Sequence, residues 1–474
     1  MIFKRHPALR NFRLTFLLIG VFSTVTGPLV ATDETRFPGQ DFWRDAAFLE
    51  SFIGSYAFAT DIEPRVTRQE QDVLREVGEL MPDDPAAATR RMRQAVTAES
   101  SAALDFVLAN LHFERDQLNE AAQRYGIAVE KFPNFMRAHK NLGMVRLRQG
   151  DYAGAARAIT RAIELGGGDG VTFGLLGLSR LQQDRPHAAE GAYRQALMLD
   201  PDNTPWRLGL AQALLSQERY RESAALLKEL IEDHPERAEY RLHLANAFLG
   251  LNEPRRAAVQ YEFVRRLGQA TGESLATLGD LYLNDALPSL ALEAHIDALE
   301  QDRPPTPSRS LRAARGLADR EAWDEADRLL RGIETRWEDS WDDADELDLL
   351  RVRARLLMRT GETDEGVAAL HRILERDPLD GASLILLARH YGRSGDPERA
   401  ELLFERAARA PGHEAEALLR HAEFLVQRNR LEPAAELLRH AQQVDPRDHT
   451  ARYLDRVEAA LRAGPNDPQP TSPY

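Results

Sequence analysis

The chain contains no cysteine in its 474 residues. This absence excludes disulfides, thiolate zinc sites, cysteine nucleophiles and the cysteine of a lipoprotein anchor. Basic residues are outnumbered, because 61 lysines and arginines face 75 acidic residues and leave a formal net charge of −14. We therefore expect no nucleic-acid partner, since such proteins need a basic surface. An acidic chain of this kind suits a protein or peptide partner instead.

A sequence pattern recurs along most of the chain and is clearest over residues 136–203, where a Leu-Gly pair and later alanines occur twice in the same spacing. The spacing is about 34 residues, the period of the tetratricopeptide repeat (TPR). On these residues the chain resembles the TPR family. Two small positions follow the period: Ala109, Gly143, Gly177, Ala211, Ala245 and Gly279 for the first, and Ala121, Ala155, Ala189, Ser223, Ala257 and Ala291 for the second.

This resemblance implies an all-α fold, a right-handed α-solenoid of about ten helix hairpins in two blocks. Each hairpin would consist of two antiparallel helices that approach closely where their small residues meet. A single hairpin cannot bury its apolar face, so neighbouring hairpins must stack into one continuous array.

The pattern and its interruptions predict the order of segments along the chain. They are a signal peptide or membrane anchor at 1–31, a helical lead-in that caps the array at 40–100, six in-register repeats at 102–302, an irregular repeat with a Pro-rich break and an acidic insert at 303–346, three further repeats at 347–448, a capping helix at 449–463 and a disordered tail at 464–474.

The N-terminus has the features of an export signal. Four basic residues up to Arg13 precede an uncharged apolar run from Leu14 to Val30, and small Ala31 follows. A basic stretch, an apolar stretch and a small residue are typical of a secretory signal peptide. The run is also close to the minimum length of a spanning helix, so an uncleaved anchor or a buried helix stays open. Either export interpretation predicts a periplasmic protein, or an inner-membrane anchor with the repeats facing the periplasm.

No catalytic, cofactor or metal motif is present in the sequence. The glycine-rich run at 166–170 lacks the Lys-Ser/Thr ending of a phosphate loop and falls where the repeat needs a turn. The acidic insert at 338–346 lacks the glycine and terminal glutamate of a calcium loop. We therefore predict a non-enzymatic protein without cofactor or metal.

The predicted binding surface is the groove lined by the first helix of each repeat, the face on which TPR proteins hold extended peptides. Side chains on one face of that helix recur at its 3.6-residue period. They predict a peptide-binding groove that includes Phe106, Asn110, Phe113, Arg137, Lys140, Asn141, Met144, Gln212, His243 and Asn246, with Asp280, Arg351, Arg355, Arg389 and Glu423 further along.

TPR domains that bind a C-terminal carboxylate use lysines and asparagines from three successive repeats. Asn110 and Asn141 match two of these positions. Phe106 stands where a lysine is expected, and Val171 and Leu175 replace basic residues of the third repeat. The carboxylate-binding pattern is therefore incomplete.

A narrower resemblance involves residues 48–66 and 131–143, which are similar to exported bacterial TPR proteins that accompany TonB-type energy-transduction systems. It implies an accessory role beside an inner-membrane motor that drives outer-membrane uptake, with components of that transport complex as partners. The alternatives are a scaffold for polysaccharide export or outer-membrane assembly, and an enzyme with an unrecognised site. The membrane would be contacted only through the N-terminal segment.

Overall fold

The computed structural model describes residues 63–338, 340–360 and 363–463. These residues form 23 α-helices and no strands, which confirms the predicted all-α solenoid. None of these helices has both the length and the apolar character needed to cross a membrane. The predicted signal or anchor at 1–31, the first part of the lead-in and the tail at 464–474 lie outside the described residues.

The chain divides into two compact units, residues 1–251 and 252–474. The division falls within the stretch predicted as six in-register repeats. The segment boundaries given above stay predictions.

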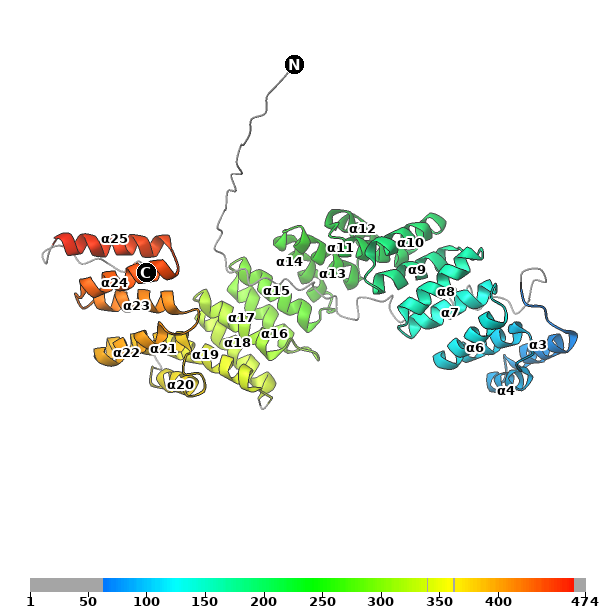
Figure 1. Ribbon diagram of the computed structural model, residues 1–474, viewed down its shortest axis with the longest axis horizontal. Helices are drawn as coiled ribbons and strands as arrows, with labels where there is room; N and C mark the ends of the chain where they lie inside the picture. Colours follow the sequence, from blue (N-terminus) through cyan, green and yellow to red (C-terminus); the bar gives the residue numbers. More distant parts are fainter. Residues whose placement is uncertain (1–62, 339, 361–362, 464–474) are drawn as a thin grey trace, which may run out of the picture. The chain divides into compact units, whose positions relative to one another are not determined.

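Unit 1 is a succession of helix hairpins, drawn in blue to green in Figure 1, in which each helix packs on the next. Its helices are α3 (Arg68–Leu80), α4 (Pro85–Ala95), α5 (Ala102–Glu114), α6 (Leu118–Lys131), α7 (Met136–Arg148), α8 (Tyr152–Glu164), α9 (Gly170–Gln182), α10 (Pro186–Leu199), α11 (Thr204–Ser216), α12 (Tyr220–Asp233) and α13 (Ala238–Gly250).

Unit 2 continues with helices of similar length, drawn in green to red in Figure 1. They are α14 (Pro254–Arg266), α15 (Gly272–Asn284), α16 (Pro288–Leu299), α17 (Pro307–Asp319), α18 (Trp323–Trp337), α19 (Asp343–Thr360), α20 (Thr363–Arg376), α21 (Gly381–Ser394), α22 (Pro397–Ala407), α23 (Glu414–Val426), α24 (Leu431–Val444) and α25 (Asp448–Ala463). The stretch predicted as irregular thus contains a helix hairpin, α17–α18.

Most hairpins turn through one residue in the left-handed region of backbone space. This residue is a glycine at Gly150 and Gly395, with φ of 78° and 91°. Elsewhere a side chain occupies it, as in Asp116, Asp184, Glu218, Ala286, Glu321 and Asn429. A left-handed conformation costs an L-residue about 1–2 kcal/mol. The turn is therefore imposed by helix packing, since most of these residues do not favour it.

The small residues of the repeat lie where the two helices of a hairpin cross, as the sequence predicts. A Cβ atom on Gly143 would lie 2.4 Å from Ile159 Cγ1, and one on Gly177 would lie 2.8 Å from the ring of Tyr193. In unit 2, a Cβ on Gly279 would lie 2.5 Å from His295 Nε2. The opposing side chain fills the space that glycine leaves open.

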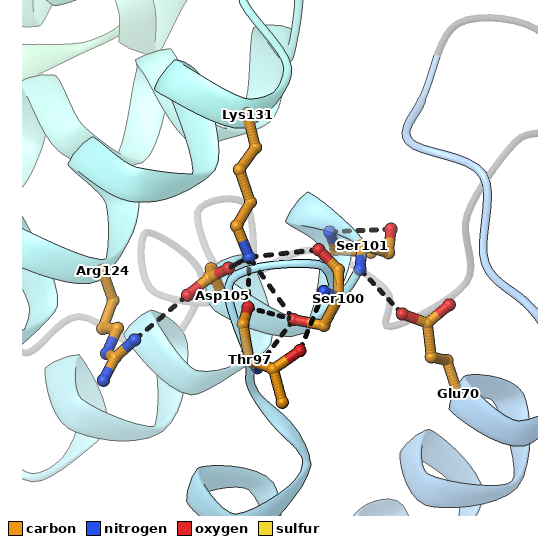
Figure 2. A network of polar contacts seen from close by, with 8 residues as sticks. Glu70, Thr97, Ser100, Ser101, Asp105, Arg124 and Lys131 are labelled. Atoms are coloured by element: carbon orange, nitrogen blue, oxygen red, sulfur yellow. Dashed lines mark hydrogen bonds and ion pairs between the residues drawn. The ribbon is translucent and has the colours of Figure 1, made fainter.

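The lead-in hairpin α3–α4 is joined to α5 by buried polar contacts, shown in Figure 2. Asp105 of α5 is fully buried, and its carboxylate accepts from Lys131 Nζ at 2.6 Å and from Arg124 Nη1 at 3.2 Å. Lys131 Nζ also donates to Thr97 O, at 2.7 Å, in the α4–α5 loop. The ammonium group thus fixes the loop against α5 and α6.

Glu70 of α3 completes this joint. Its Oε1 accepts from the backbone N–H of Ser101, the N-cap residue of α5, at 2.7 Å (Figure 2). Burial opposes ionisation of Glu70, but hydrogen bonds from Ser101 and Thr67 outweigh it and lower its pKa. Charged contacts therefore supplement the apolar contacts between the lead-in and the first full repeat.

Candidate peptide-binding surfaces

The first helices of successive repeats lie beside one another within each unit. In unit 1, α7 contacts α9, α9 contacts α11, and α11 contacts α13. In unit 2, α15 contacts α17, α17 contacts α19, and α21 contacts α23. Side chains far apart in sequence therefore meet on the faces of these helices, which we call the inner helices.

Phe106 lies in an aromatic cluster rather than on an open surface. It is 1% exposed, and its ring centroid lies 4.9 Å from that of Phe135 and 5.7 Å from that of Tyr125. The guanidinium of Arg137 lies 5.0 Å from the Phe106 centroid, and its Nη1 lies 3.1 Å from Glu63 Oε1. A stacked guanidinium with a carboxylate partner is a stable arrangement in a partly dry site.

Asn110 and Asn141 come together with Tyr125 in a buried polar cluster. Asn141 Nδ2 donates to Asn110 Oδ1 at 3.3 Å and to the Tyr125 hydroxyl at 3.2 Å, and that hydroxyl donates to Asn110 Oδ1. Asn110 Nδ2 is buried and has no acceptor among the described residues. An amide donor left in this state costs about 1–3 kcal/mol. The sequence prediction did not include Tyr125, which stands one repeat before Ile159.

Three other predicted groove residues have structural contacts of their own. Lys140 is 9% exposed, and its Nζ lies 2.6 Å from Asp169 Oδ2, at the N-cap of α9. Burial opposes ionisation of Asp169, but hydrogen bonds from Lys140 and Thr172 outweigh it and lower its pKa. Phe113 lies 5.3 Å below the guanidinium of Arg148, and Met144 is fully buried in the core.

Gln212 and His243 pair across neighbouring inner helices of unit 1. Their Nε2 atoms are 2.9 Å apart. Burial lowers the pKa of His243 to about 4, so the ring is neutral at pH 7 and its Nε2 accepts from the Gln212 amide. Asn246 lies one turn after His243 and is half-buried.

The structure thus brings together Phe106 with Arg137, Asn110 with Asn141, and Gln212 with His243. Most residues of the predicted groove in unit 1 are buried, and such side chains present little area to a ligand. Their role in binding stays a prediction.

The inner helices of unit 2 carry charged side chains that pair across repeats. Arg309 of α17 contacts Glu273 and, at 3.3 Å, Asp280 of α15. Burial raises the pKa of Asp280, although Arg309 opposes this shift. Arg351 of α19 lies 2.6 Å from Asp380, at the N-cap of α21. These pairs link each inner helix to the next.

Two further residues of this face belong to the predicted set. Arg355 of α19 pairs with Asp319 at the end of α17. On α23, Glu423 accepts from Arg420 Nη1 at 3.0 Å.

Arg389 of α21 differs from these arginines. Neither Arg389 nor Arg393, one turn later, has a hydrogen-bond or ion-pair partner among the described residues, although both are exposed. Partial desolvation and the neighbouring guanidiniums of Arg393 and Arg420 lower the pKa of Arg389. The sequence prediction included Arg389 but missed Arg393, which the helical period places on the same face.

The acidic insert contributes to the start of α19. Asp342 Oδ1 accepts from the backbone N–H of Asp345 at 2.7 Å, and Asp345 in turn accepts from Ser308 at 2.5 Å. Glu346 pairs with Arg376 at 2.9 Å. No cluster of His, Asp or Glu suited to a metal ion occurs in the described part of the chain.

A cavity of about 770 Å³ opens in unit 2 beside α14 and the α15–α16 turn. Its walls include the apolar side chains of Val259, Phe263 and Leu287, and charged residues such as Arg255 and Asp285, which pair at 2.6 Å. The sequence prediction missed this cavity because α14 is a second helix of its repeat, away from the predicted face.

Comparisons with known proteins agree with this architecture. Three sequence models described as tetratricopeptide repeat match residues 180–247, residues 106–170 and 385–449, and residues 347–390. A search of the curated proteins found no match.

Solved structures similar to this chain are TPR proteins or contain parts of similar fold. One from Parabacteroides merdae is 16% identical over 56% of this chain and 98% of its own, with a TM-score of 0.38. YrrB, described as a TPR protein with an unusual peptide-binding site, is 19% identical over 44% of this chain and 97% of its own, with a TM-score of 0.34. PilF of Pseudomonas aeruginosa is 22% identical over 46% and 96%, with a TM-score of 0.36.

Proposed function

Because this chain is a tetratricopeptide repeat protein, we propose that it is a non-enzymatic scaffold of the bacterial envelope that binds a segment of a partner protein along its inner helices. TPR repeats serve protein–protein interaction, and the inner helices gather side chains from successive repeats. In this proposal the partner belongs to a TonB-type transport complex.

The observation that carries this proposal is the amide donor of Asn110. It is buried without an acceptor among the described residues, next to the amide of Asn141 on the following inner helix. A backbone carbonyl of a bound segment would supply the missing acceptor. Two amides at this spacing could bind both the carbonyl and the N–H of one peptide unit, which fixes an extended segment regardless of its side chains.

The envelope location is supported by the sequence, because a basic stretch, an apolar run and small Ala31 are typical of an export signal. The TonB-type partner is supported by the resemblance of residues 48–66 and 131–143 to exported TPR proteins that accompany such systems. Polysaccharide export or outer-membrane assembly is the alternative process for the same scaffold.

The proposal is tested by cross-linking in cells of the source organism, followed by purification of the tagged full chain from the envelope. We expect the wild type to recover components of a TonB-type complex, and Asn110→Ala to lose most of that recovery. Asn134→Ala, in the exposed turn before α7, is the matched control and should recover as much as the wild type. Hydrogen exchange of α5–α8 establishes that the variant is folded.

Two results would contradict parts of the proposal. Recovery of polysaccharide-export or outer-membrane assembly proteins in place of transport components would replace the partner and keep the scaffold. Equal recovery by the wild type and a folded Asn110→Ala variant would remove the Asn110 cluster from the binding surface.

A further inference from the structure

The inner helices of unit 2 follow a rule of charge pairing that α21 breaks. On α17 and α19, Arg309, Arg315, Arg351 and Arg355 each have a carboxylate partner on a neighbouring element, at 3.3 Å or less where the pair is Arg309–Asp280, Arg315–Asp348 or Arg351–Asp380. Arg389 and Arg393 of α21 have no such partner among the described residues. Two adjacent cations therefore stand on this face without a carboxylate to match them.

Their surroundings concentrate positive charge further. Arg420 of α23 faces the same region, because α21 and α23 are in contact and its charge acts on Arg389. The carboxylates nearby, Glu416 and Glu423, lie on α23 itself, at 4.0 Å and 3.0 Å from Arg420. Both also favour the charged form of Arg389, but the guanidiniums of Arg393 and Arg420 outweigh them.

The C-terminal end of α21 receives a third cation from the turn after α23. Arg428 Nη2 donates to Gly392 O at 2.8 Å, and its guanidinium lies 3.9 Å from the ring centroid of Phe424. Phe424 is 6% exposed, so Arg428 is held on a fixed apolar support. The face is thus preorganised, with arginine side chains on two helices and one turn.

The repeat register gives this face a counterpart in unit 1. Arg389 directly follows buried Ala388, as Asn110 directly follows buried Ala109. Arg420 lies two residues before Ala422, as Asn141 lies two residues before Gly143. The same two positions therefore carry a neutral amide pair in unit 1 and a pair of cations in unit 2.

We propose that Arg389 and Arg393 form an anion-binding subsite that holds a side-chain carboxylate of an acidic protein segment lying along α21 and α23. This proposal rests on the scaffold function and names the chemistry of the segment that unit 2 accepts. Guanidiniums bind carboxylates through two parallel N–H donors, and partial desolvation strengthens such contacts. A protein of net charge −14 disfavours the polyanionic backbone of a nucleic acid, which leaves an acidic protein segment as the partner.

The test measures binding of short fluorescent peptides to the full chain by anisotropy at low salt. One peptide alternates Glu and Ala and has both termini capped, and its partner peptide carries Gln in place of Glu. We expect the Glu peptide to bind at least about tenfold more tightly than the Gln peptide. Arg389→Gln and Arg393→Gln should each remove most of that preference. Arg372→Gln on α20, an exposed arginine of a second helix, is the matched control and should keep it.

Several outcomes would overturn the subsite. They are equal binding of the two capped peptides, no binding of the Glu peptide up to about 1 mM, or equal loss in Arg372→Gln and Arg389→Gln. Binding of only an uncapped Gln peptide would assign the arginines to a terminal carboxylate and also overturn the proposal. Circular dichroism of each variant verifies folding. If the peptides fail while envelope cross-linking still recovers a partner, the subsite is wrong and the scaffold function stands.

Discussion

The helix crossing between α9 and α10 allows a quantitative test of the packing. A Cβ atom added at Gly177 would lie 2.8 Å from Cδ1 and Cε1 of Tyr193 and 2.9 Å from its Cγ. The Tyr193 ring has no room to move away, because it is 2% exposed and also packs on Gly209, where an added Cβ would lie 2.3 Å from Tyr193 Cζ. The contact near Cγ matters most, since that atom lies close to the backbone.

The expected magnitude is a balance of two effects. Overpacking of a filled core costs about 1–3 kcal/mol. Replacing a helical glycine by alanine returns up to about 1 kcal/mol through helix propensity. Gly177→Ala should therefore destabilise this hairpin by about 1–2 kcal/mol. Gly191→Ala, on α10, is the matched control, because an added Cβ there meets no atom within 4 Å. It should stabilise the hairpin by about 0.5–1 kcal/mol.

The assay is hydrogen exchange with mass spectrometry on the full chain, because an array of repeats does not unfold in one step. Peptides from α9 and α10 should differ between the two variants by roughly 30- to 150-fold in protection, since about 1.4 kcal/mol corresponds to tenfold. In a Tyr193→Ala background, Gly177→Ala should no longer destabilise. Equal effects of the two glycine substitutions would refute the proposed crossing.

Three further predictions concern other parts of the chain. Lys131→Met should destabilise the α5–α6 hairpin by about 2–3 kcal/mol, because it leaves fully buried Asp105 with Arg124 alone, whereas Lys228→Met on an exposed face should change protection little. Ala286→Gly should stabilise the α15–α16 turn by up to about 1 kcal/mol, because φ is 57° there; a loss of protection would contradict the strain assigned to this residue. Burial raises the pKa of Glu239 to about 7, above its value of 4.5 in the unfolded chain, so the stability present below pH 4.5 is lost as pH rises through 7. Glu239→Gln should therefore raise protection of α13 at about pH 8, by up to about 3 kcal/mol from about 1.4 kcal/mol per pKa unit, and leave it unchanged at about pH 4.

The period of the repeat allowed much of the fold to be predicted from sequence. Small residues recur where helices cross, and the structure places Ile159, Tyr193 and His295 against Gly143, Gly177 and Gly279. The late seventh repeat was also visible, and its turn residue in the structure is Glu321. These features are local, because one hairpin and its neighbour determine them.

The lead-in shows the limit of local reasoning. The sequence predicts helices at 69–81 and 85–98, and the structure has α3 at Arg68–Leu80 and α4 at Pro85–Ala95. The second helix ends early because Val96 is extended, which lets Thr97 and Ser100 reach Lys131. Lys131 is more than thirty residues away in the sequence, so the helical period carries no trace of that contact.

What the sequence alone determined is the repeat, its register and the positions that face the inner helices. What only the tertiary structure decided is how each of those side chains is satisfied. Lys140 and Arg351 have the same kind of sequence position as Arg389, but the first two meet Asp169 and Asp380 on the next repeat. Arg389 meets guanidiniums instead. The physical reason is that ion pairing depends on distances of a few ångströms between helices, and stacking of whole repeats sets those distances.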